Sequence, residues 1–291
     1  MLALGYRISN DNRMTMEGFQ GDSALLRIHE SFAATTFGET LATEVRYDKY
    51  RPEGITKQRW EELLGPDVNN LDHLFDTYQL TGGFIRHSDR LQPGLLSPHD
   101  KAILRVASQI HDWGESITTD VNYHDKTVED ELAEQAAFDA NLDAFYPAND
   151  PEMRALINEA AETVIFDPDS RLGSILNSIE RIGYLRTALC ADRHAREGSA
   201  PDCEENLRWL AAAVLSSDHI ETLAIRGQQV YASHDFLVLR ENDISAAYEA
   251  ADNAVFFSHE AIQIADTRGH ELDRARLVWK MWCAGINSVA R

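Results

Sequence analysis

The sequence predicts an all-α protein, and two observations support this prediction. From Ser97 onward, apolar residues recur at spacings of three and four, the period of an amphipathic helix, and several segments begin with acidic residues. The strand-like run 228–240 has no partner spaced as a hairpin, so we expect at most a small ribbon. The periodic segments are 128–145, 151–166, 173–197, 204–217, 242–269 and 270–290.

The first 70 residues are the least regular part of the chain. The stretch 45–54, VRYDKYRPEG, mixes charged and aromatic residues and is either a binding loop or a solvated surface connection. Residues 55–65 predict a short helix, with Thr56 as its N-cap and Gly65 just past its end. Residues 71–80 predict the next helix.

A clearer helix start follows at Ser97, which is a capping residue, with Pro98 at the first helical position. This helix extends to His111 and places four apolar residues on one face: Ile103, Leu104, Ala107 and Ile110.

We expect three regions: an N-terminal extension (1–70), a helical core (71–200) and a C-terminal helical region packed on the core (201–291). The run HAREGSAPDCEE is the best internal boundary, although a long interhelical loop explains it equally well. The segment 270–290 has more large apolar residues than one helical face uses, which predicts a homo-oligomer interface.

Composition excludes several classes of function. The 27 Lys and Arg against 48 Asp and Glu give a net charge of −21, so duplex nucleic acid is not an expected partner. Three cysteines without a CxxC pair argue against a thiolate zinc site and for a reducing compartment, so we expect a cytoplasmic protein. No apolar stretch approaches the roughly 20 residues that span a bilayer, so no membrane association is expected.

The segment HDWGESITTD, residues 111–120, carries the strongest chemical signal. Adjacent His111 and Asp112 at a helix end can both turn to one divalent ion, which binds imidazole nitrogen and carboxylate oxygen together. Glu115 can stand beside the ion without ligating it, where a base would act. The alternative is a helix C-terminus with solvated acids.

These residues resemble the HD-domain metal-dependent phosphohydrolases, and within them the 5'-deoxynucleotidase-like branch. The resemblance covers residues 81–197, and the branch's HDxxExxxxD pattern is matched by His111, Asp112, Glu115 and Asp120. It implies an HD-type helical bundle, to which N- and C-terminal helices are added here. The family's first histidine begins an earlier helix, and the match FIRHSDRL makes it His87.

The family's last ligand is normally an Asp on a later helix, and the alignment of ILNSIERIGYL puts Glu180 there. A register shifted by three residues would put Gly183 at that position and leave the site one ligand short. Only His124 lies between the HD pair and the last acid, so a mononuclear hydrolytic site is preferred over a di-iron oxygenase.

The resemblance implies one divalent ion, Mn²⁺, Co²⁺ or similar, which lowers the pKa of bound water and polarises a phosphoryl oxygen. Glu115 would then orient or deprotonate the water, and Asp120 would protonate the leaving alkoxide. Arg86 and Lys126 are candidate phosphate-binding cations, or else a helix-end charge and a solvated lysine. Trp113 either stacks on a base or belongs to the core.

The expected function is therefore a metal-dependent phosphohydrolase that acts on a small phosphorylated molecule, with a nucleotide monophosphate as the favoured substrate. Two alternatives remain open: a non-catalytic HD-like protein that binds a partner, and a nucleoside triphosphate hydrolase.

Overall fold

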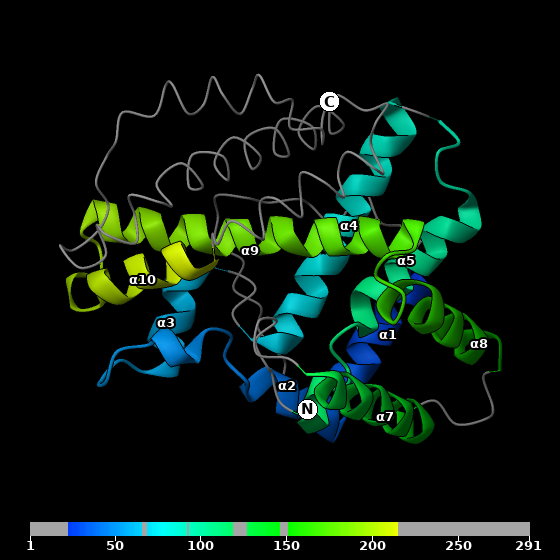
Figure 1. Ribbon diagram of the computed structural model, residues 1–291, viewed down its shortest axis with the longest axis horizontal. Helices are drawn as coiled ribbons and strands as arrows, with labels where there is room; N and C mark the ends of the chain where they lie inside the picture. Colours follow the sequence, from blue (N-terminus) through cyan, green and yellow to red (C-terminus); the bar gives the residue numbers. More distant parts are fainter. Residues whose placement is uncertain (1–22, 66–68, 92, 119–126, 146–150, 215–291) are drawn as a thin grey trace.

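The computed structural model describes residues 23–65, 69–91, 93–118, 127–145 and 151–214 (Figure 1). This part of the chain is helical and contains no β-strand; one isolated antiparallel bridge joins Val45 and Asn69. The all-α prediction is confirmed for these residues. The elements are α1 (Ser23–Ala33), α2 (Thr36–Thr43), η2 (Asp48–Tyr50), α3 (Lys57–Leu64), α4 (Asn70–Leu91), α5 (Pro98–Ile110), α6 (Glu115–Thr118), α7 (Val128–Phe145), α8 (Pro151–Ala160), η3 (Ala161–Ile165), α9 (Arg171–Glu197), η4 (Pro201–Cys203) and α10 (Glu204–Val214).

Two helix boundaries follow the predicted capping signals. The Thr56 side chain accepts a hydrogen bond in the first turn of α3, and Gly65 ends that helix with a φ of 109°. At the start of α5, Ser97 and Asp100 form a reciprocal capping box. The predicted apolar face of α5 is buried: Ile103, Leu104, Ala107 and Ile110 are at most 1% exposed.

Helix α4 is longer than expected. Its N-cap is Asn69, whose Oδ1 accepts from the Asp72 backbone N–H at 2.8 Å while its Nδ2 donates to the Asp72 carboxylate. The helix then continues to Leu91, so the expectation that His87 begins a helix is wrong. Helical glycines cost about 1 kcal/mol each relative to alanine. The Gly82–Gly83 pair nonetheless stays helical because its flanking apolar residues, Leu80, Phe84 and Ile85, are buried.

Helix α9 is the longest described helix, and α3, α4, α5, η3 and α10 pack against it (Figure 1). The buried apolar residues form one continuous core, which includes Leu74 of α4, Leu104 of α5 and Ile175 of α9. Ile28 and Phe32 of α1 belong to the same core. Residues of the predicted N-terminal extension therefore help to build the core that supports α4 and α5.

Helix α7 braces the loop that follows α5. Trp113 in this loop is fully buried and stacks on Phe32, with ring centroids 4.5 Å apart, so it belongs to the core rather than to a base-stacking site. A Cβ atom on Gly114 would lie 2.6 Å from the backbone oxygen of Glu134, so only glycine permits this approach of α7. Asn141 of α7 donates to the Trp113 carbonyl. The position of His111 and Asp112 just before this loop is thereby secured.

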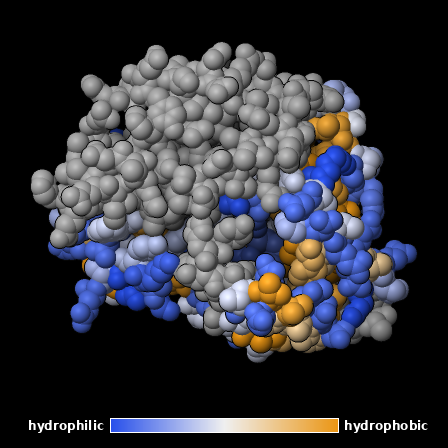
Figure 2. All heavy atoms as spheres, viewed as in Figure 1, coloured by the Kyte–Doolittle hydropathy of each residue, from blue (hydrophilic) through white to orange (hydrophobic). Residues whose placement is uncertain are grey.

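The described surface is mixed in character. Figure 2 shows hydrophilic residues interspersed with apolar patches on the side where α7 and α8 lie. Val128 and Leu132, one turn apart on α7, are 67% and 61% exposed.

The connection from α9 to α10 is short, spanning residues 198–203, and α10 packs on α9. This connection lies within the run HAREGSAPDCEE, residues 194–205, for which the sequence predicted either a domain boundary or a long interhelical loop. Both the strand-like run 228–240 and the segment 270–290, predicted to mediate oligomerisation, lie outside the described residues. No helix in the described ranges is long and apolar enough to cross a membrane.

Candidate metal centre

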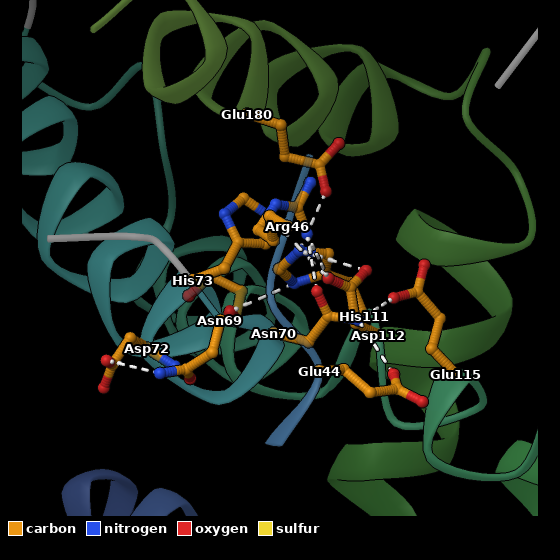
Figure 3. Close-up of polar contacts among 11 residues, drawn as sticks. Glu44, Arg46, Asn69, Asn70, Asp72, His73, His111, Asp112, Glu115 and Glu180 are labelled. Carbon is orange, nitrogen blue, oxygen red and sulfur yellow. Dashed lines mark hydrogen bonds and ion pairs between the residues drawn. The ribbon is translucent and has the colours of Figure 1, made fainter. Parts of the chain in front are cut away.

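His111 stands at the C-terminal end of α5, with one ring nitrogen anchored and the other turned toward acidic groups (Figure 3). Its Nδ1 lies 3.2 Å from the Ser108 carbonyl oxygen. Because a carbonyl oxygen can only accept, Nδ1 is the donor in this contact, and Nε2 is the ring nitrogen that faces the acidic groups. Nε2 lies 3.4 Å from Asp112 Oδ1 and 3.1 Å from Glu180 Oε1. This arrangement of a histidine held by a backbone carbonyl is typical of metal ligands.

His73 is a second histidine beside His111. It lies in the first turn of α4, where its backbone N–H closes the first helical hydrogen bond to Asn69, and it is 1% exposed. Its Nε2 lies 3.8 Å from Asp112 Oδ2, and its ring lies 5.1 Å from the ring of His111. On its other side the His73 ring stacks on Tyr184 of α9 at 6.0 Å.

The ligand atoms of His73, His111 and Asp112 all lie within 4.8 Å of one another. Two imidazole nitrogens and a carboxylate oxygen are a donor set that suits first-row divalent ions. These three residues could therefore hold a divalent ion of the kind that the resemblance implies.

Glu180 of α9 adds a second carboxylate beside His111. The sequence left two registers open for the last ligand, one with Glu180 and one with Gly183. In the structure the Glu180 carboxylate faces the cluster, and Gly183 lies three residues farther along the helix. Burial raises the pKa of the Glu180 carboxyl; the charge of His111 lowers this pKa, and that of Asp112 raises it. The charges of Arg181 and Arg46 also lower this pKa, but burial is the largest cause and disfavours the charged form of the carboxyl.

The sequence assigned the first histidine ligand to His87, whereas the cluster in the structure contains His73. Both belong to α4, and His87 lies fourteen residues later (87 − 73 = 14), a rise of about 21 Å along the helix axis. The side chain of His87 lies outside the described side chains. The physical reason for the difference is the cap at Asn69, which starts α4 early and brings His73 beside the end of α5. The sequence did contain a signal for His73, because this histidine lies at the start of the apolar segment 71–80, for which a helix was predicted.

The cation at the centre is Arg46, which belongs to the stretch 45–54. Its Nη1 lies 3.4 Å from Asp112 Oδ2, and its guanidinium lies over the Tyr184 ring, 5.6 Å from the centroid. The Arg46 side chain is 9% exposed. The next residue, Tyr47, adopts a positive φ of 61°, a conformation that is uncommon outside glycine and often marks functional sites. The stretch is therefore not simply a solvated connection, because Arg46 is buried against the cluster; whether it binds a ligand stays a prediction.

Of the two cations expected from the sequence, only Arg86 is described, and it lies farther along α4 than the cluster. Arg86 is half-buried on α4, sixteen residues beyond the start of the helix at Asn70 (86 − 70 = 16), and burial lowers its pKa, with Arg105 acting in the same direction. Lys126 lies outside the described residues. Arg46 was missed because its contact with Asp112 joins residues 66 positions apart, which no local pattern reveals.

Glu115, the predicted base, begins α6 just beyond the cluster. Its Oε2 accepts a hydrogen bond of 2.7 Å from Asn70 of α4 (Figure 3). Asp120, the predicted acid, lies outside the described residues. The structure therefore brings together His111, Asp112, Glu115 and Glu180 of the predicted set, and it adds His73, Arg46 and Asn70.

Comparison with known proteins gives no family assignment: no family model, curated protein or solved structure matches this chain.

Proposed function

We propose that this protein is a metal-dependent phosphohydrolase of the HD type that cleaves a phosphate ester of a small molecule. The observation that supports the proposal is the convergence of His73, His111 and Asp112 from two helices, with Glu180 arriving from a third. The resemblance implies a histidine–aspartate pair at a helix end and a histidine from an earlier helix, but it assigned that histidine to His87, whereas the cluster contains His73.

His73, His111 and Asp112 would hold the ion, with Glu180 as the fourth ligand. Mn²⁺, Co²⁺ and similar ions suit this donor set. When bound, the ion would supply a Lewis acid that polarises a phosphoryl oxygen and makes water more acidic.

Glu115 would orient the attacking water and accept its proton. Its carboxylate accepts a hydrogen bond from Asn70, and in this orientation we expect it to act on the water rather than to ligate the ion. Asp120, five residues later, would donate a proton to the leaving alkoxide, as the resemblance implies.

Arg46 would bind the phosphate oxygens. A chain with a net charge of −21 needs a local cation to attract a phosphate, and Arg46 supplies one next to the candidate ligands. Its planar guanidinium can pair with two phosphate oxygens at once. A small phosphate monoester therefore suits the site, and a nucleoside monophosphate is the substrate that we favour from the resemblance.

The non-catalytic alternative has one observation in its favour. Arg46 pairs with Asp112, so an internal cation already offsets part of the negative charge at the cluster. If this pair replaces a metal ion permanently, the chain would be a structural relative of the enzymes.

A phosphatase panel on the full-length protein separates these functions. We expect release of phosphate from at least one nucleoside monophosphate in the presence of Mn²⁺ or Co²⁺, and loss of that activity in His111→Ala. His99→Ala is the matched control, because His99 is exposed and pairs only with the surface residue Glu159 in the described structure. Selective cleavage of nucleoside triphosphates would favour the alternative of a nucleoside triphosphate hydrolase. The absence of both turnover and bound metal would favour the non-catalytic protein.

A further inference from the structure

Asn70 occupies an unusual position for a polar side chain. It is the first residue of α4 and is 1% exposed, yet the three side-chain hydrogen bonds described for it all join charged side chains. Its Nδ2 donates to Glu115 at 2.7 Å and to Glu44 at 3.3 Å, and its Oδ1 accepts from Arg46 Nη1 at 3.3 Å. The orientation of the amide follows from chemistry, because carboxylates can only accept and a guanidinium can only donate.

The backbone explains why these groups meet. Val45 and Asn69 form an antiparallel bridge, and the Asn70 N–H donates to the Glu44 carbonyl at 3.2 Å. This short pairing sets the segment that carries Arg46 against the start of α4. Asn70 therefore stands between the candidate phosphate-binding cation on one side and the candidate base on the other (Figure 3).

We propose that Asn70 is a positioning residue for the reaction, whose amide holds the Glu115 carboxylate in the orientation that accepts a proton from water. This inference rests on the proposed function. Glu115 is partly buried, and the 2.7 Å hydrogen bond from Asn70 fixes the direction of its carboxylate, while Arg46 lies on the far side of the same amide. The Asn70 amide supplies the donor and, through its oxygen, keeps Arg46 directed to Asp112.

Few residue types could do this at position 70. Two donors and one acceptor on a short planar group are the properties of asparagine. Aspartate has the same shape and would keep the contact with Arg46, but it would turn an acceptor toward Glu44 and Glu115. Asn70→Asp therefore removes the hydrogen bonds that Asn70 donates to Glu44 and Glu115, with little change in side-chain volume.

The test is a double-mutant cycle on the full-length protein, with a phosphate monoester that the wild type cleaves. We expect Asn70→Ala and Asn70→Asp to lower kcat by about 10- to 100-fold, the usual effect of removing a partner that orients a functional group. In a Glu115→Ala background, the same substitutions should change kcat less than about twofold, because the group they orient is gone. Metal content, measured by elemental analysis, should be unchanged.

A merely structural role would give a different result, namely the same fold loss in both backgrounds, and that result would overturn the inference. Asn70→Asp carries the test if Asn70→Ala does not fold. Thr56→Ala is the control, since it also removes a side-chain hydrogen bond at the start of a helix, the one that Thr56 accepts from the Arg59 N–H, but on α3, which carries no residue of the cluster. We expect it to leave kcat unchanged in both backgrounds.

The same data separate this inference from the proposed function. A normal kcat in Glu115→Ala, or a wild type without turnover, would overturn both. A large loss in Glu115→Ala together with a normal kcat in both Asn70 variants would overturn only the role of Asn70.

Discussion

His111 Nε2 lies 3.1 Å from Glu180 Oε1, a contact that joins the end of α5 to the middle of α9. It depends on the packing of these two helices in the core, where Leu104 and Ile179 are buried. His111 also belongs to the cluster with His73 and Asp112, so one helix end connects His73 of α4 to the Glu180 carboxylate of α9.

Metal content should distinguish the two candidate histidines. We expect His73→Ala and Asp112→Ala to lose most of the bound ion after purification in Mn²⁺ or Co²⁺, because each removes a member of the cluster. His87→Ala should retain the ion, as should the exposed control His99→Ala. Elemental analysis measures this directly. Metal loss in His87→Ala with full retention in His73→Ala would restore the assignment made from the sequence.

Glu115→Ala and Asp120→Ala should retain the ion yet lose about 10²- to 10⁴-fold in kcat, the usual effect of removing a general acid or base. The loss should be larger in kcat than in KM, because the interaction belongs to the transition state. A nitrophenyl phosphate has a good leaving group and needs no proton donor, so it should rescue Asp120→Ala much more than Glu115→Ala. Equal loss on both substrates would show that Asp120 does not act as the acid.

Arg46→Met should raise KM for the phosphate ester about 10- to 100-fold, the range expected when a charged hydrogen bond to the ligand is lost. Arg46→Lys should recover part of this affinity, because lysine keeps the charge but not the planar fork. Arg59→Met on the exposed face of α3 is the control, since Arg59 pairs with the surface residue Glu62. A KM in Arg46→Met equal to that of the control would remove Arg46 from the substrate site.

The stability of the protein should depend on the protonation of His29. Burial lowers the pKa of His29 from 6.5 to about 4, and its ring lies against Phe75. The unfolded chain therefore binds this proton more readily, so the free energy of unfolding falls as the pH drops from 6.5 toward 4. The full difference corresponds to about 3 kcal/mol.

Urea unfolding of wild type and His29→Leu between about pH 7 and pH 4.5 measures this contribution. The variant should lose less stability than the wild type as the pH falls. His99→Leu gives a contrast of opposite sign, because a hydrogen bond to Glu159 raises the pKa of His99 in the folded state. Parallel pH profiles for wild type and His29→Leu would show that His29 is not the group responsible.

The local features of this fold could be predicted from the sequence. The caps at Thr56 and Ser97, the end of α3 at Gly65 and the buried face of α5 depend on interactions within about one helical turn. The His111–Asp112 pair was also recognisable, because its two residues are adjacent and end an amphipathic helix. Glu180 was reached through the resemblance, and its register agrees with its position in the structure.

The tertiary structure alone determined which other residues share the site. His73 lies beside His111 because α4 starts at the Asn69 cap and packs against α5, and Arg46 lies beside Asp112 because residues 44–46 pair with the start of α4. These contacts join residues from 24 to 66 positions apart. Such contacts depend on how several helices bury one common core, and that arrangement has no periodic signal in the sequence.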